Sequence, residues 1–114
     1  MKTEEFLNFL KENPRANTFG RTMEVIDKNY YFTPVAFKNG QIKNAAGENN
    51  GSCKIFYFAK RNNLNKEETL ACFGEVYFEQ VLKQPNGEGH QNIRNFMKSG
   101  WEGIHFKETA LQPK

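Results

Sequence analysis

The sequence predicts an α+β fold that is mainly helical, with about five helices, a small antiparallel β-hairpin and a candidate third short strand. Apolar residues recur at intervals of three and four in five segments, the spacing of helices that bury one face. Between the second and third segments, YYFTPVAF at positions 30–37 runs into Asn39-Gly40, a dipeptide typical of hairpin turns. The 114 residues suit a single domain spanning 1–114.

Two helices are expected before the strands. Thr3, which precedes two Glu residues, is the expected N-cap of the first helix, and Asn13-Pro14 ends it. Thr18 is the expected N-cap of the second helix, whose apolar residues recur at helical spacing as far as about Lys28.

The segment 30–37 alternates in the manner of a strand, and Pro34 places that strand at a sheet edge because proline has no backbone donor. Asn39-Gly40 then forms the turn, and residues 41–44 return as the second strand. The hairpin leads directly into NAAGENNGSCK at positions 44–54, where small and amide residues crowd together between two apolar segments.

The third and fourth helices are expected to form the core. Ser52 is the expected N-cap of the third, and KIFYFA is interpreted as helix rather than strand because this cap precedes it. Asn65 and Glu68 have the spacing of a capping box. Behind them, an apolar stripe reaching Val81 predicts one continuous central core helix.

A turn around Pro85 precedes the fifth helix, which begins near His90 and ends at Gly100 as its C′ residue. The alternation of Ile104 and Phe106 predicts the short closing strand. The tail from residue 107 is expected to be frayed.

Composition limits the possible partners. The formal net charge of +3 comes from Lys and Arg scattered among Glu, so we expect no nucleic-acid partner. No run approaches the roughly 20 apolar residues of a membrane span, and no signal-peptide pattern is present, so we expect no membrane association and a cytoplasmic location.

Cys53 and Cys72 are expected to be reduced, buried thiols. No zinc-ligand spacing or cofactor motif is found, and a monomer is expected.

Three blocks of the sequence together resemble the HopJ family: FTPVAFKNGQIKNAAGENNGSCKIF, TLACFGEVYFEQVL and HQNIRNFMKSGWEGIHF. Members are small bacterial proteins catalogued as type III secretion effectors. The resemblance implies no established enzymatic activity and no cofactor, and an unknown protein or small molecule as partner. It also implies the bacterial cytoplasm as location, with secretion into a host cell by a type III system as the further destination.

The loop 44–52 and the segment 90–95 are the candidate binding site. Small residues let a ligand approach backbone amides, and the start of a helix supplies further donors. Two structural alternatives stay open: the loop amides satisfy their own backbone, or the segment 90–95 ties its helix to the loop. The candidate binding residues are Asn44, Glu48, Asn49, Asn50, Ser52, His90, Asn92, Arg94 and Asn95.

The alternative function is a cysteine-dependent hydrolase or transferase with Cys53 as nucleophile. A thiol near a helix N-terminus can have a lowered pKa, and His90 or His105 would serve as the base. A third group to orient that histidine would come from Asn92, Asp27 or Glu48. Because free cysteines are among the most buried residues, a core thiol is the favoured interpretation of Cys53, and we expect Cys72 to be structural.

Overall fold

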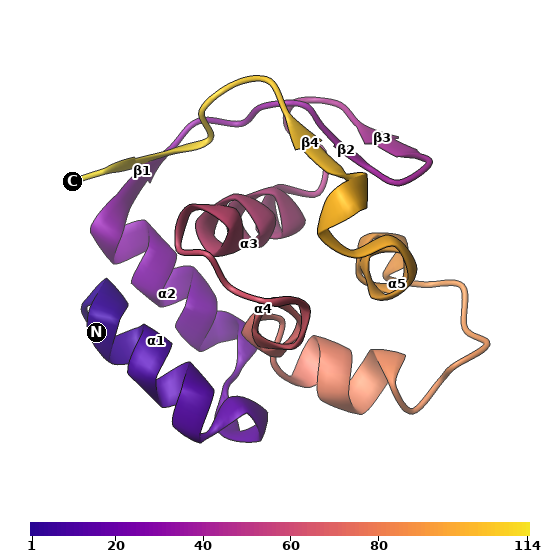
Figure 1. The fold of residues 1–114 in the computed structure, drawn as a ribbon, viewed down its shortest axis with the longest axis horizontal. Coiled ribbons are helices and arrows are strands. Elements are labelled where there is room, and N and C mark those ends of the chain that lie inside the picture. The colour runs from indigo at the N-terminus through magenta and orange to yellow at the C-terminus, as the bar shows by residue number, and fades with distance from the viewer.

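Helix α3 (Asn50–Arg61) occupies the centre of the computed structural model, which describes residues 1–114, and the other elements surround it (Figure 1). The prediction of a mainly helical α+β fold is confirmed, including the number of α-helices. The remaining helices are α1 (Thr3–Glu12), α2 (Phe19–Asn29), α4 (Lys66–Cys72) and α5 (Gln91–Ser99), with short 3-10 segments η1 (Pro14–Ala16) and η3 (Gly100–Gly103) and a π-helical segment η2 (Val76–Val81).

The strands form two separate antiparallel sheets. One is two-stranded and the other has the order β3-β2-β4, which confirms the third short strand expected at Ile104 and Phe106. Helices α3 and α5 lie on one side of the three-stranded sheet (Figure 1). The strands are β1 (Tyr30–Phe32), β2 (Phe37–Asn39), β3 (Ile42–Asn44), β4 (Ile104–Phe106) and β5 (Leu111–Pro113).

The core is aromatic and centres on Phe56 of α3, which is fully buried. Its ring centroid lies 6.1 Å from that of Phe37 in β2, 5.5 Å from Phe73 after α4, and 5.0 Å from Phe96 in α5. Rings at these separations and tilts contribute beyond the area that they bury. Through Phe56, helix α3 therefore packs against both the sheet and α5. The starts of α3 and α5 border the site described below.

Two of the four predicted helix N-caps, Thr18 and Asn65, are confirmed. The Thr18 side chain accepts a hydrogen bond from the Arg21 N–H, and the Asn65 and Glu68 capping box is present. Thr3 is the first residue of α1 rather than its N-cap. The prediction for α3 is wrong by more, because the helix begins before Ser52 and its N-cap is Asn49, which has a left-handed backbone with φ 52°.

The predicted core helix is not continuous. It ends at Cys72, and the chain turns at Gly74, whose φ is +58°. A Cβ atom at this position would lie 2.5 Å from the backbone nitrogen of Phe19, closer than real Cβ contacts allow. The start of α2 thus approaches the chain so closely here that only glycine fits, and the helical pattern resumes as η2.

The predicted single strand over 30–37 is also wrong, because β1 and β2 belong to different sheets and the residues around Pro34 join them. The hairpin exists, but its turn lies one residue later than predicted. Asn39 pairs with Ile42 as the last residue of β2, and Gly40 with φ +60° begins the turn. In this register, Asn39 lies in the strand and its side chain is buried.

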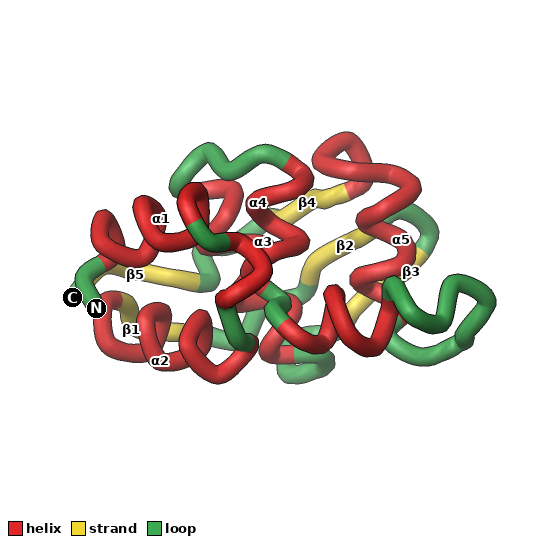
Figure 2. The backbone as a smooth tube through the Cα atoms, turned by 90° about the horizontal axis from the view of Figure 1, so that it is seen from below, coloured by secondary structure: helices red, strands yellow, loops and turns green.

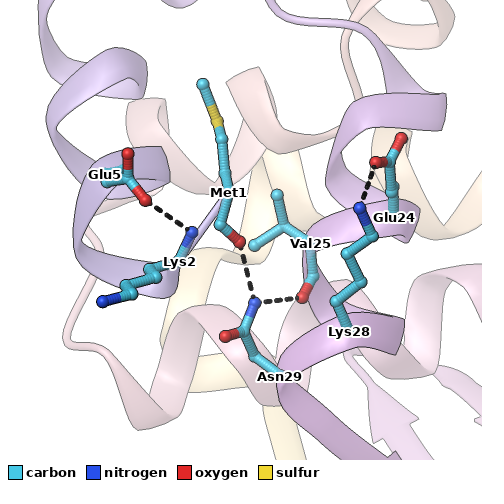
Figure 3. Close-up of polar contacts among 7 residues, drawn as sticks. All are labelled: Met1, Lys2, Glu5, Glu24, Val25, Lys28 and Asn29. Carbon is cyan, nitrogen blue, oxygen red and sulfur yellow. Dashed lines mark hydrogen bonds and ion pairs between the residues drawn. The ribbon is translucent and has the colours of Figure 1, made fainter.

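The prediction of a frayed tail from residue 107 is wrong. Strand β5 pairs with β1, and Leu111 is fully buried (Figure 2). Both termini lie at the same end of the molecule, next to the end of α2. The Asn29 side chain donates to the backbone carbonyls of Val25 and Met1 (Figure 3). The backbone carbonyl of Asn29 accepts from the Lys114 N–H. No helix is long and apolar enough to cross a membrane.

Candidate functional site

Three buried asparagines connect the hairpin to the start of α5. The Asn39 side chain donates to the backbone carbonyl of Asn92 at 2.8 Å and to its side-chain oxygen at 3.0 Å. Asn44 and Asn92 exchange side-chain hydrogen bonds at 3.2 and 3.0 Å. These buried hydrogen bonds hold the elements that carry the amides in one geometry, although the side-chain oxygen of Asn39 is buried without a partner.

Asn49 extends this network to the start of α3, since its side chain donates to the Asn44 oxygen at 2.7 Å. Asn49 and His90 are the N-cap residues of α3 and α5, and both have left-handed backbones. The network therefore places the beginnings of two helices, far apart in the sequence, against the same strand.

A cleft of about 410 Å³ lies between these two helix starts. One part of its lining is polar and comes from the predicted loop and the predicted α5 segment. The other part is apolar and comes from α2, β3, the α4–η2 junction and α5. The lining residues are Phe19, Ile42, Asn49, Gly51, Ser52, Phe73, Val76, His90, Gln91, Asn92 and Ile93.

Backbone donors are available at the cleft because the first turn of a helix has no intrahelical acceptors. In α3, the first N–H with an acceptor in its own helix is that of Cys53, which donates to the Asn49 carbonyl. In α5, the Ile93 and Arg94 N–H groups donate to the His90 carbonyl. The N–H groups before these positions therefore face no helical partner. Neither N-cap residue makes a side-chain capping bond.

Four of the predicted binding residues line the cleft: Asn49, Ser52, His90 and Asn92. They come from both predicted segments, so the structure brings the two segments together. The His90 ring is exposed and its Nε2 lies 2.9 Å from the side-chain oxygen of Gln80.

The other predicted residues do not line the cleft. Asn44 is buried behind it in the amide network, Asn50 is exposed, and Glu48 accepts from the Ala45 N–H at 2.7 Å within its own turn. Arg94 donates to the carbonyls of Gly89 and Gln84 at 2.6 and 2.7 Å, which holds the preceding loop.

Asn95 donates to the Asn39 carbonyl and so attaches α5 to the hairpin. Together with the Asn44–Asn92 pair, this contact supports the alternative in which the segment 90–95 ties its helix to the loop. The two roles are compatible, because Asn92 both bonds to the hairpin and lines the cleft.

Sequence reasoning missed the apolar half of the lining and the central role of Asn39. Phe19, Phe73 and Val76 carry the same helical pattern as core residues, so the sequence contains no signal that they border a cleft. Asn39 was assigned to a turn because Asn-Gly is a strong turn signal. Gln91, directly after His90, also lines the cleft, and a single glutamine in a sequence gives no signal of such a role.

The thiol of Cys53 does not have the surroundings of a nucleophile. It is 1% exposed, and its Sγ contacts the Val35 carbonyl at 3.7 Å. Burial raises the pKa of Cys53, and burial also raises the pKa of Cys72 well above that of a free thiol. His90 contacts Gln80 instead of a thiol, and His105 is exposed on β4. Both cysteines are free, and no three potential metal-ligating side chains cluster together.

Comparison with known proteins identifies the family. The HopJ type III effector protein model matches residues 3–111. The crystal structure of VPA0580, described as a protein of unknown function, is 55% identical in sequence with a TM-score of 0.98, covering 100% of this chain and 95% of that chain. No curated protein matches the chain. Because the family model spans nearly the whole sequence, the chain belongs to the HopJ type III effector protein family.

Proposed function

We propose that the chain is a non-enzymatic binding module that holds its ligand in the cleft between the N-termini of α3 and α5. The observation that supports this proposal is the convergence of two polar segments, 49–52 and 90–92, on one cleft. A concave site with an apolar wall and a few converging polar groups is the usual form of a small-ligand site.

The lining indicates the chemistry of the ligand. Backbone N–H groups at two helix starts, together with Ser52 and Gln91, favour hydrogen-bond acceptors such as carboxylates or amide carbonyls. Phe19, Phe73 and Val76 offer an apolar surface on the opposite side. The ligand that fits both features is a small apolar group, or the side chain of a partner protein, that carries an acceptor at one end.

The test is a titration of the ¹⁵N-labelled protein with phenylacetate and N-acetylphenylalanine, which combine a ring with a carboxylate. We expect saturable shifts at the amides of Gly51, Ser52 and Gln91. Gln91→Trp should obstruct the cleft and weaken binding by about tenfold, equal to about 1.4 kcal/mol. Lys98→Trp, at another exposed position of α5, is the matched control.

Two results would contradict the proposal. One is an absence of shifts at the cleft amides up to millimolar probe. The other is equal binding by the Gln91→Trp and Lys98→Trp variants, which would place the probe elsewhere on the surface. Thermal midpoints of both variants should stay near that of the unmodified protein, since both replaced side chains are exposed.

We further propose, on the support of the family's description alone, that the protein acts in a host cell after type III secretion. Helix α1 begins at Thr3 and buries Phe6 and Leu10, so passage through a narrow secretion channel would require this helix to unfold. A fusion of the chain to a calmodulin-dependent adenylate cyclase reporter should raise host cyclic AMP only when the secretion system is intact. Equal signals with and without the secretion system would overturn this assignment.

A further inference from the structure

The exposed face of the three-stranded sheet carries a row of basic side chains. In the register of the sheet, Lys38 of the central strand β2 lies opposite Lys43 of β3 on one side and opposite His105 of β4 on the other. All three residues are exposed, whereas Phe37 and Asn39, their neighbours along β2, are buried. Each strand has only three residues, so these middle positions make up the outward face.

No ion pair involves this row. The three ion pairs of the chain are Lys28–Glu24, Lys54–Asp27 and Lys83–Glu79, and none involves the sheet. Residues 28–66 contain seven Lys or Arg and a single Glu, whereas the rest of the chain contains nine basic and twelve acidic residues. The modest net charge of +3 therefore conceals a basic region that includes β2, β3 and α3.

Like charges directly opposite each other on neighbouring strands destabilise a sheet. A lysine on an edge strand is commonly explained as protection against pairing with another sheet. That explanation suits Lys43 on the edge strand β3, but it does not apply to Lys38, because β2 is paired on both sides. The row therefore needs another explanation.

A hollow of about 320 Å³ lies over the row. Its charged and titratable lining residues are Lys38, Lys43, His105, Lys107 and Glu108, and Ala36, Phe37 and Asn44 complete the lining. It shares no lining residue with the cleft between α3 and α5. We propose that this face is a docking site for an acidic segment of a partner polypeptide, whose carboxylates lie along the basic row.

Charge and shape favour a polypeptide over other anions. Neighbouring strands lie about 4.8 Å apart, so the row spans only about 10 Å, room for a few carboxylates but not for an extended nucleic-acid backbone. The exposed large apolar residues are Met1, Tyr31 and Leu82, and none lies on this sheet. The face therefore has neither the stacking surface that single-stranded nucleic acids use nor the apolar surface that inserts into membranes.

The test measures fluorescence anisotropy of a labelled oligoglutamate peptide at low salt, with an oligoglutamine peptide as the uncharged control. Lys38→Glu, at the centre of the row, should weaken binding by about tenfold or more. Lys98→Glu makes the same charge change at an exposed position of α5 and should leave binding within about twofold. Added salt should weaken the wild-type interaction.

The thermal midpoint separates loss of the site from loss of the fold. Lys38→Glu replaces a like-charge pair with an opposite-charge pair, so its midpoint should not fall. Equal binding by the two charge variants and the unmodified protein would overturn the proposal, as would equal losses in both variants. Tighter binding of oligothymidylate than of oligoglutamate at matched charge would overturn it in favour of nucleic acid.

Discussion

The side chains of Asn44 and Asn92, 48 positions apart in the sequence, form a reciprocal pair in which each amide donates to the oxygen of the other. This pair attaches the end of β3 to the first turn of α5, and the bond from Asn49 adds the start of α3. The walls of the cleft are thus held by an amide network to which two residues of its lining, Asn49 and Asn92, belong.

Asn92→Ala should lower the free energy of unfolding by about 2 kcal/mol or more, because it leaves buried polar atoms of Asn39 and Asn44 with fewer partners. Urea denaturation is the measurement. Asn50→Ala, which removes an exposed amide at the start of α3, should change stability by no more than about 0.5 kcal/mol. Equal effects of the two substitutions would show that the network does not stabilise the fold.

Gly74→Ala should destabilise the protein by about 1–3 kcal/mol, since the added Cβ atom would clash with the backbone at Thr18 and Phe19 and φ is positive. Gly20→Ala in α2 is the matched control, because nothing lies within 4 Å of its Cβ position. The control should be neutral or stabilising by about 0.5–1 kcal/mol, since alanine favours helix. Thermal unfolding of both variants measures these effects. An unchanged thermal midpoint in Gly74→Ala would contradict the close approach of α2 to Gly74.

The thiols of Cys53 and Cys72 should react with a disulfide reagent only as fast as the protein opens, because both are buried and burial raises the pKa of each. Labelling at pH 8 should be slow in buffer and immediate in denaturing urea. Fast labelling of Cys53 in the folded protein would revive the nucleophile hypothesis.

Stability should fall in alkaline solution for the same reason. The folded state holds the thiol protons more tightly than the unfolded state, so this contribution is complete below the ordinary thiol pKa of 9.0 and is lost as pH rises above it. Urea midpoints measured from pH 8 to 10 should decline less steeply in a Cys53→Ala, Cys72→Ala variant than in the unmodified protein. Parallel slopes would contradict this linkage.

Lys38→Glu should raise stability by about 0.2–1 kcal/mol at low salt, because opposite charges then face each other between β2 and β3. Lys38→Gln should give a smaller gain, as it only removes the repulsion. Differential scanning calorimetry at low and at about 1 M salt measures both effects, and the gain should shrink at high salt. A loss of stability in Lys38→Glu would mean that the lysine row is not repulsive.

Much of the fold was predictable because its signals are local. Thr18 and the Asn65–Glu68 pair cap helices through hydrogen bonds to residues three positions away, and the HopJ resemblance rests on short contiguous blocks. The two polar segments were singled out by composition, and four of their residues do line the cleft.

The remaining features depend on contacts between residues far apart in the chain. Gly74 interrupts a good helical pattern because α2 approaches it, and β5 forms because β1 is available to pair. The cleft and the basic row arise in the same way, from helices and strands placed side by side. By itself, the sequence determined the class of fold, the caps at Thr18 and Asn65, and the family. Tertiary structure decided which surfaces meet, because burial and strand register depend on long-range contacts that no local pattern encodes.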